Sequence, residues 1–285
     1  MDKTIREYLD SLQVNDLTMK SYNNALGHFN DFLKSKGKTV LNIEAKEVAT
    51  YLDYLQKNME LSVSSIRGYI NAVKRLYKHL EEHGITRDES YLLRLPKAPT
   101  NQLPKFLTTR EVIRLFEEVS KEDNDFLRIR NTFAMHMLVY HGLRVQEITD
   151  LTTDSIKDDV ITVVGKGNKA RMLVLTDVVL NSYNEYMKIR QSNAKQLLVS
   201  EEGRPIQKRA VQYMVQKYLD NAGLGQFSVH SLRHTCAVLM MDNGLDIKEV
   251  QEVLGHTDIA TTQIYASVST QNKRRIANVM DNIVI

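Results

Sequence analysis

Apolar residues recur at helical spacing over the first third of the chain. They fall at every third or fourth position in three segments, residues 22–33, 48–55 and 66–80. An apolar stripe of this period covers one face of a helix and needs other helices to pack against. The pattern predicts that residues 1–95 fold as a small helical bundle.

The pattern changes after residue 95. Three of the four prolines, Pro96, Pro99 and Pro104, lie in residues 96–107, where apolar periodicity is weak. Proline-rich segments without periodicity are typical of extended connectors. Residues 96–107 are therefore predicted to link two domains.

A second domain is predicted over residues 108–285. It opens with a capping-box pattern, Thr108 to Glu111, followed by an apolar helical stripe. Two alternating runs within residues 158–176 flank a Gly-Lys-Gly-Asn turn, which is typical of a β-hairpin, and helical spacing returns from residue 209. The predicted fold class is mainly α: an N-terminal helical bundle and a mostly helical second domain with a small antiparallel sheet.

Composition and charge restrict the class of protein. The chain is 42% hydrophobic and 26% charged, and no apolar run is long enough to span a bilayer, so we expect a soluble protein that does not bind membranes. The first residues are charged and do not resemble a signal peptide, and a single cysteine excludes an internal disulfide. These features favour a cytoplasmic location.

The net charge of +3 hardly favours nucleic acid by itself, so the placement of the cations matters more. The third helical segment carries a basic face among its apolar positions. Charge alone does not separate a DNA-binding face from a solvated surface. The four candidate DNA-binding residues are Arg67, Lys74, Arg75 and Lys78.

Two short stretches of the second domain carry cations that have ordinary structural explanations. In "HGLRVQEI", Arg144 and Glu147 have the spacing of a surface ion pair on a helix. In "GKGNKAR", Lys166 falls on the predicted hairpin turn, where a solvated lysine is common. Neither stretch indicates a site by itself.

The stretch "HSLRH" is harder to explain structurally. His230 and Arg233 are three residues apart at the start of a helix whose remainder is strongly apolar, and the helix N-terminus adds a partial positive charge. This arrangement predicts an anion site with donors pointing out of the core. The histidines His230, His234 and His256 lack zinc-site spacing and nearby carboxylates or cysteines, so no metal site is predicted.

The combination of residues suits phosphodiester chemistry. Two arginines present planar forks of donors to the non-bridging oxygens of a phosphate. In "LGHTDIATTQIYA", Tyr265 follows His256 by nine residues, and a tyrosine hydroxyl can attack phosphorus when a base and a positive field are present. Because a phosphotyrosine bond retains the energy of the broken phosphodiester, rejoining the strand requires no cofactor. The chain also lacks a P-loop motif.

These motifs together resemble the tyrosine recombinases of the Xer and phage-integrase family, over essentially the whole chain. The resemblance implies that Arg144, Arg233 and His256 hold the scissile phosphate. It implies that Lys166 is the general acid for the leaving 5′ oxygen and that His230 transfers a proton. Tyr265 is then the nucleophile, and Glu147 supports the first arginine.

The resemblance also implies partners. It implies a C-shaped clamp on double-stranded DNA with an inverted-repeat core site, strand exchange through a Holliday junction, a synaptic tetramer and possible accessory proteins. A tail helix with an apolar stripe would dock on a neighbouring subunit or fold back on its own domain; the stripe comprises Ile276, Val279, Met280 and Ile283. A DNA-relaxing topoisomerase and a catalytically silent DNA-binding factor are the alternatives.

Overall fold

The computed structural model describes residues 1–14, 16–59, 61–97, 104–165 and 169–255. The chain divides into two compact units, Met1–Gln102 and Leu103–Ile285, and the division falls within the proline-bearing segment. No helix in these ranges is long and apolar enough to cross a membrane.

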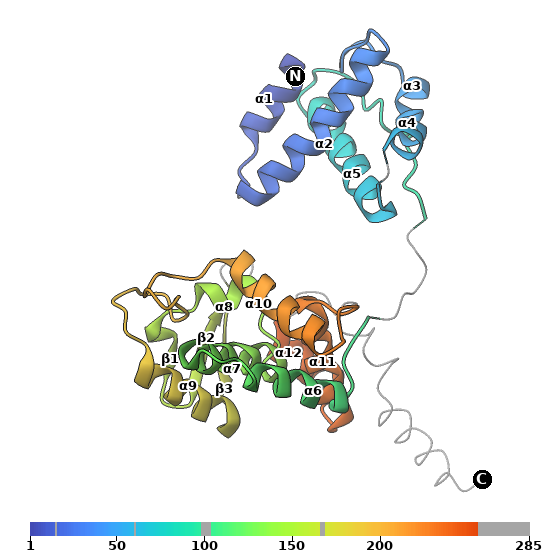
Figure 1. Ribbon diagram of the computed structural model, residues 1–285. Helices are drawn as coiled ribbons and strands as arrows, with labels where there is room; N and C mark the ends of the chain where they lie inside the picture. Colours follow the sequence, from blue (N-terminus) through green and yellow to red (C-terminus); the bar gives the residue numbers. More distant parts are fainter. Residues whose placement is uncertain (15, 60, 98–103, 166–168, 256–285) are drawn as a thin grey trace, which may run out of the picture. The chain divides into compact units, whose positions relative to one another are not determined.

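All regular secondary structure in the described part of the N-terminal unit is helical (Figure 1). The two longest helices, α2 and α5, pack against each other, and Phe29, Tyr51 and Tyr77 lie fully buried in the core. Asp2 caps the first helix, because its side chain accepts a hydrogen bond from the Thr4 amide. The helices are α1 (Lys3–Ser11), α2 (Asp16–Ser35), α3 (Ala45–Ala49), α4 (Tyr51–Asn58) and α5 (Val63–Glu82).

The apolar segment 48–55 does not form the single helix that its spacing predicts. The helix breaks at Thr50, which ends α3 and begins α4. The Thr50 hydroxyl donates to the Glu47 carbonyl at 2.7 Å, and the Thr50 amide also donates to that carbonyl at 3.0 Å. A threonine that bonds the preceding turn in this way competes with the helical ladder.

The C-terminal unit is built around α7, which contacts α6, α8, α9 and α11. The capping box predicted at the start of α6 is confirmed, since the Thr108 amide donates to the Glu111 carboxylate at 2.7 Å and the Thr108 hydroxyl accepts from the Glu111 amide. Just before this helix, the Leu107 amide donates to the buried Thr235 hydroxyl at 2.8 Å. The helices are α6 (Thr109–Ser120), α7 (Asp125–Tyr140), α8 (Val145–Asp150), α9 (Asp177–Ile189), α10 (Lys208–Asn221), α11 (Val229–Asp242) and α12 (Ile247–Leu254).

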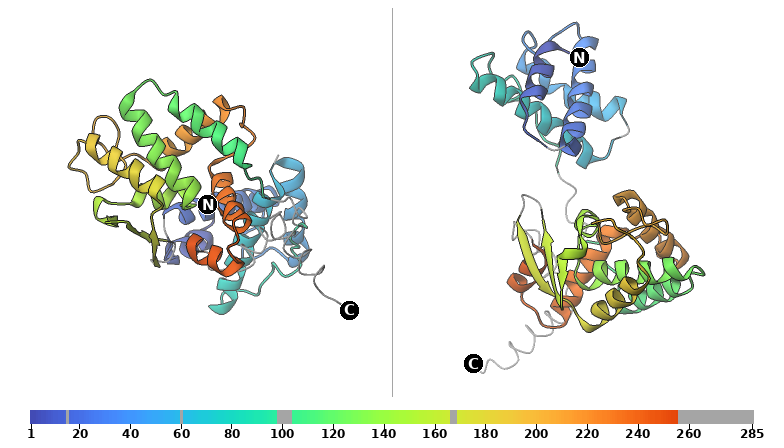
Figure 2. Two further views of the ribbon diagram at one scale, coloured as in Figure 1. Left: turned by 90° about the horizontal axis from the view of Figure 1, so that it is seen from below. Right: turned by 90° about the vertical axis from the view of Figure 1, so that its left-hand side faces the viewer.

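A three-stranded antiparallel sheet lies at one edge of this unit (Figure 2). The predicted hairpin is confirmed as β2 (Val160–Val164) and β3 (Ala170–Val174), with Val163 opposite Arg171. The Gly165 amide donates to the Lys169 carbonyl at 2.8 Å. The sequence did not predict the third strand, β1 (Ile156–Lys157), nor the short 3-10 helix η1 (Thr153–Ser155), because two or three residues carry no periodic signal.

Candidate active site

A tight turn between α7 and α8 places the first candidate arginine. Gly142 has a φ of 58°, and a Cβ at this position would lie 2.5 Å from Cδ2 of Leu254. Only glycine therefore fits, both in conformation and in space. The turn leaves Arg144 in an extended conformation as the residue that precedes α8.

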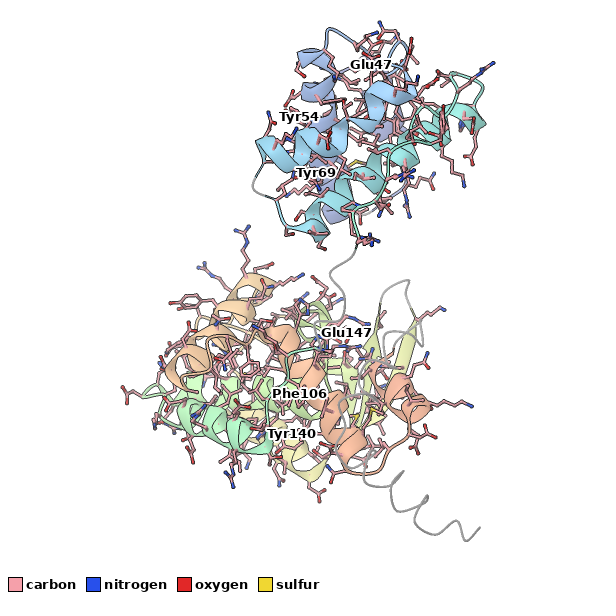
Figure 3. All side chains as sticks on the ribbon, turned by 90° about the vertical axis from the view of Figure 1, so that its right-hand side faces the viewer. Glu47, Tyr54, Tyr69, Phe106, Tyr140 and Glu147 are labelled. Carbon is pink, nitrogen blue, oxygen red and sulfur yellow. The ribbon has the colours of Figure 1, made fainter. Side chains whose placement is uncertain are left out.

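Glu147, which is labelled in Figure 3, binds two arginines of the site and lies near a third. Its side chain is 4% exposed, and Arg144 binds the carboxylate with Nη1 at 2.6 Å from Oε1 and with its backbone amide at 2.9 Å from Oε2. Arg171 binds both oxygens from β3, with Nη1 at 3.1 Å from Oε1 and Nη2 at 3.0 Å from Oε2. Nη1 of Arg233 lies 4.0 Å from Oε2. In the pair that looked like an ordinary surface ion pair in the sequence, Glu147 is buried, whereas the Arg144 side chain is 36% exposed.

The arginines also set the charge of the carboxyl group. Burial alone would raise the pKa of Glu147, but the hydrogen bonds from Arg171 and Arg144 outweigh burial and hold this pKa below its usual range. Glu147 is therefore ionised at neutral pH. Three guanidinium groups around one carboxylate leave an excess of two positive charges.

Arg233 is the fifth residue of α11, just beyond the predicted first turn, and its side chain turns inward. It is 7% exposed; Nη1 donates to the Gly142 carbonyl, and Nη2 donates to the Leu254 carbonyl at 2.6 Å. His230 on the first turn is exposed. The prediction that both cations point out of the core is thus wrong for Arg233, because backbone carbonyls of two other segments bind its guanidinium.

Carbonyl oxygens at the C-terminal end of α12 accept hydrogen bonds from all three arginines. The carbonyls of Val253, Leu254 and Gly255 accept in turn from Nε of Arg171 at 2.9 Å, from Arg233 at 2.6 Å and from Nη2 of Arg144 at 3.5 Å. The carbonyl end of a helix carries a partial negative charge, so cations are stabilised there. The guanidinium groups therefore converge directly before His256 in the chain.

The structure brings together Arg144, Glu147 and Arg233 and places His230 at the start of the helix that carries Arg233. Lys166, His256 and Tyr265 lie outside the described residues, as does the apolar stripe of the tail. Within the described ranges, no group of three or more His, Cys, Asp or Glu side chains could hold a metal ion.

Sequence reasoning missed Arg171. The motif "GKGNKAR" was considered only for its turn lysine, yet the alternation along β3 carries a usable signal. Leu173 is buried and Met172 exposed, so period-two alternation puts Arg171 on the inward side with Leu173. A charged residue on the buried side of a strand needs a partner, and here that partner is Glu147.

The predicted basic face of the N-terminal unit is divided. Lys74, Arg75 and Lys78 line a hollow of about 520 Å³ between α2 and α5, and Nη1 of Arg75 donates to the Tyr22 hydroxyl at 2.8 Å. Arg67 is not among the lining residues. Its Nη1 donates to the Pro96 carbonyl at 2.5 Å and so fastens the start of the proline-bearing segment to α5.

Comparison with known proteins agrees with this architecture. Residues 105–272 match the phage integrase family, and residues 3–87 match the phage integrase N-terminal SAM-like domain. The tyrosine recombinase XerC of Staphylococcus haemolyticus is 31% identical over 271 residues, covering 91% of this chain and 89% of that protein. XerC of Staphylococcus epidermidis is 30% identical, covering 97% of this chain and 96% of that protein.

Solved structures share the fold. XerH recombinase bound to a palindromic difH substrate, in a post-cleavage complex, aligns with a TM-score of 0.75 and 23% identity over 93% of this chain and 80% of that chain. A lambda integrase tetramer bound to a Holliday junction aligns with a TM-score of 0.74 and 18% identity over 92% of this chain and 74% of that chain. From the family match and the XerC relatives, the chain belongs to the phage integrase family and is a site-specific tyrosine recombinase that acts on DNA.

Proposed function

We propose that this chain cleaves a DNA core site with Tyr265 as the nucleophile, holds the strand as a 3′-phosphotyrosine and passes it to a partner duplex through a Holliday junction. The observation that carries the proposal is the convergence of Arg144 and Arg233 on Glu147 and on the end of α12. In the cytoplasm, the substrate is double-stranded DNA with inverted-repeat half-sites.

Arg144 and Arg233 bind the scissile phosphate and stabilise the charge that develops on its non-bridging oxygens. Their guanidinium groups are already oriented by fixed carbonyls and a buried carboxylate, so little reorganisation is needed during the reaction. The excess of two positive charges also matches a phosphodiester whose negative charge grows as the tyrosine oxygen attacks. His256, directly after Gly255, is a third phosphate ligand.

Two proton transfers complete the reaction. The Tyr265 hydroxyl must lose a proton to attack, and the exposed His230 at the start of α11 accepts it. The departing 5′ oxygen must gain a proton, and Lys166, which lies between β2 and β3 in the sequence, donates it. The retained phosphotyrosine bond then allows the reverse attack by a 5′ hydroxyl, without a cofactor or a metal.

The N-terminal unit contributes affinity for the DNA backbone. Three cations around one hollow support phosphate binding by Lys74, Arg75 and Lys78, whereas Arg67 is engaged by Pro96. Assembly into a tetramer is proposed by likeness to the lambda integrase tetramer on a Holliday junction. The tail stripe would dock on a neighbouring subunit in that assembly, where accessory proteins can set direction.

The wild-type protein is first used to select a bound duplex from a randomised pool. The test then compares the wild-type protein with Tyr265→Phe on a nicked form of that duplex. The variant is expected to bind this duplex with unchanged affinity and to form no covalent adduct on a denaturing gel, because only the hydroxyl is lost. Recombined products from two wild-type sites would separate strand exchange from simple relaxation. An undiminished adduct from the phenylalanine variant would refute the proposal.

A further inference from the structure

All three guanidinium nitrogens of Arg171 donate hydrogen bonds within the candidate site. Its side chain is 12% exposed, its two terminal nitrogens bind the two oxygens of Glu147, and Nε donates to the Val253 carbonyl at 2.9 Å. A planar guanidinium whose three nitrogens all donate hydrogen bonds to different acceptor atoms is held in one position. One strand residue is thereby tied to α8 and to the end of α12.

Two glycines pack against the Arg171–Glu147 pair. A Cβ on Gly165 would lie 3.6 Å from Oε1 of Glu147 and 3.7 Å from Nη1 of Arg171. A Cβ on Gly255, which has a φ of 65°, would lie 3.1 Å from Nη1 of Arg171 and 3.2 Å from its Cδ. These glycines directly precede Lys166 and His256 in the sequence. Arg171 therefore lies next to the glycine that precedes each of these two proposed catalytic residues.

We propose that Arg171 is a positioning residue of the recombinase active site. It holds Glu147 so that Arg144 and Arg233 face the phosphate. It also fixes the backbone at the glycines that directly precede Lys166 and His256, because both glycines pack against it. The inference rests on the proposed function, because it gives those two residues their proposed roles.

The charge of Arg171 has a second effect. Arg144 lies 2.6 Å from Oε1 of Glu147, and Arg233 lies 4.0 Å from Oε2. With Arg171 removed, a buried carboxylate would have only these two arginines as partners and would compete with the phosphate for their donors. Arg171 thus leaves the other two arginines available for the substrate.

If Arg171 only stabilised the fold, replacing it would affect cleavage no more than replacing another well-bonded arginine. Arg190 provides this matched control. Arg190 is also a part-buried arginine at a fixed position, but its donors bind the carbonyls of Ser192, Ala194, Gln196 and Leu197 in a loop that contains no candidate catalytic residue. Loss of either arginine removes several hydrogen bonds from the fold. Only loss of Arg171 should alter the chemical step.

The experiment measures single-turnover cleavage and affinity for the full-length protein on the selected nicked duplex. Arg171→Met is expected to cleave about 100-fold more slowly, as a displaced catalytic group does, with affinity changed less than about threefold. Arg190→Met, corrected for its folded fraction, should cleave within about threefold of wild type. Arg171→Lys keeps the charge without the fork and provides the same readout if the methionine variant does not fold.

A double variant tests the electrostatic part. Glu147→Gln combined with Arg171→Met should cleave about tenfold faster than Arg171→Met alone, because the unpaired carboxylate no longer holds Arg144. The proposal is overturned if the Arg171 variants cleave at the wild-type rate or no more slowly than Arg190→Met, or if the double variant gains nothing. A wild-type protein that forms no adduct would instead refute the proposed function.

Discussion

Arg75 and Lys78 on α5 lie at the surface of the N-terminal unit, whereas Arg171 and Arg233 of the catalytic unit are almost fully buried. Each surface cation has a single polar partner in these contacts: Arg75 binds the Tyr22 hydroxyl, and Lys78 lies 3.8 Å from the exposed carboxylate of Glu82. The buried cations bind backbone carbonyls and a buried carboxylate. Cationic side chains thus occur in two settings, exposed on the N-terminal unit and buried in the catalytic unit.

This difference means that the exposed cations contribute mainly to the affinity for DNA and the buried cations mainly to the rate of cleavage. Exposed cations attract DNA by displacing its counterions, which gives a contribution that falls with salt and tolerates imprecise geometry. Buried cations held by fixed acceptors cost little reorganisation in the transition state, so their contribution depends on orientation rather than on charge alone. A variant that keeps charge and loses geometry should therefore act very differently in the two units.

The largest effect is expected from Arg233→Lys. The ammonium keeps the charge but cannot bind the carbonyls of Gly142 and Leu254 and a phosphate with one planar fork, so cleavage should fall about 1,000-fold. Rapid-quench cleavage of the selected nicked duplex at saturating protein measures this loss. A lysine variant with wild-type rate would show that charge alone suffices in the buried site.

A smaller effect is expected on stability from Glu147→Gln. Removing the charge leaves Arg171 buried without its counterion, which should lower the free energy of unfolding by about 3 kcal/mol at pH 7. Because the folded-state pKa of Glu147 lies below the unfolded value of about 4.3, this stabilisation is present above that value and is lost as the pH falls through the folded pKa.

Urea unfolding of both proteins at several pH values measures that prediction. The difference between wild type and Glu147→Gln should be constant near neutrality and should shrink below about pH 4.3. A difference that stays unchanged down to pH 3 would mean that the carboxylate charge does not stabilise the fold.

The smallest effect is expected from replacing Lys74 and Arg75 together with alanine. Each lost phosphate contact should reduce the slope of log affinity against log salt by about one, so the double variant should lose about two. Fluorescence anisotropy over a series of KCl concentrations measures the slope. Lys3→Ala on α1, whose side chain is 89% exposed, is the control and should leave the slope unchanged.

The sequence predicted most helices and the hairpin because their apolar periods reflect one-sided burial, and that burial is what the structure contains. It failed at Thr50, where a side-chain hydrogen bond breaks a helix without interrupting the apolar spacing. It also failed for α9, a helix that lies before residue 209, where helical spacing was predicted to return, and for β1, which is two residues long.

For the site, motif spacing identified Arg144, Glu147 and Arg233 as candidates and indicated the Arg144–Glu147 pair, but it revealed neither the burial of Glu147 nor the carbonyl partners of Arg233. Three-residue spacing is the same for a surface pair and for a buried one, so burial of Glu147 depends on α12 and β3, which are distant in sequence. Arg171 was missed because its motif was considered only for the turn lysine, although the alternation along β3 places Arg171 on the inward side. The roles of Lys166, His256 and Tyr265 stay predictions.

The bonds from Arg67 to Pro96 and from Leu107 to Thr235 define a tether between the two units. The anchored residues are eleven positions apart, so the tether reaches at most about 40 Å. Once one unit has bound DNA, a short tether keeps the other at an effective concentration in the millimolar range. Doubling its length would cost only about 0.6 kcal/mol, whereas a tether too short to span both binding positions prevents joint engagement entirely. Insertions into this segment should therefore be tolerated far better than deletions.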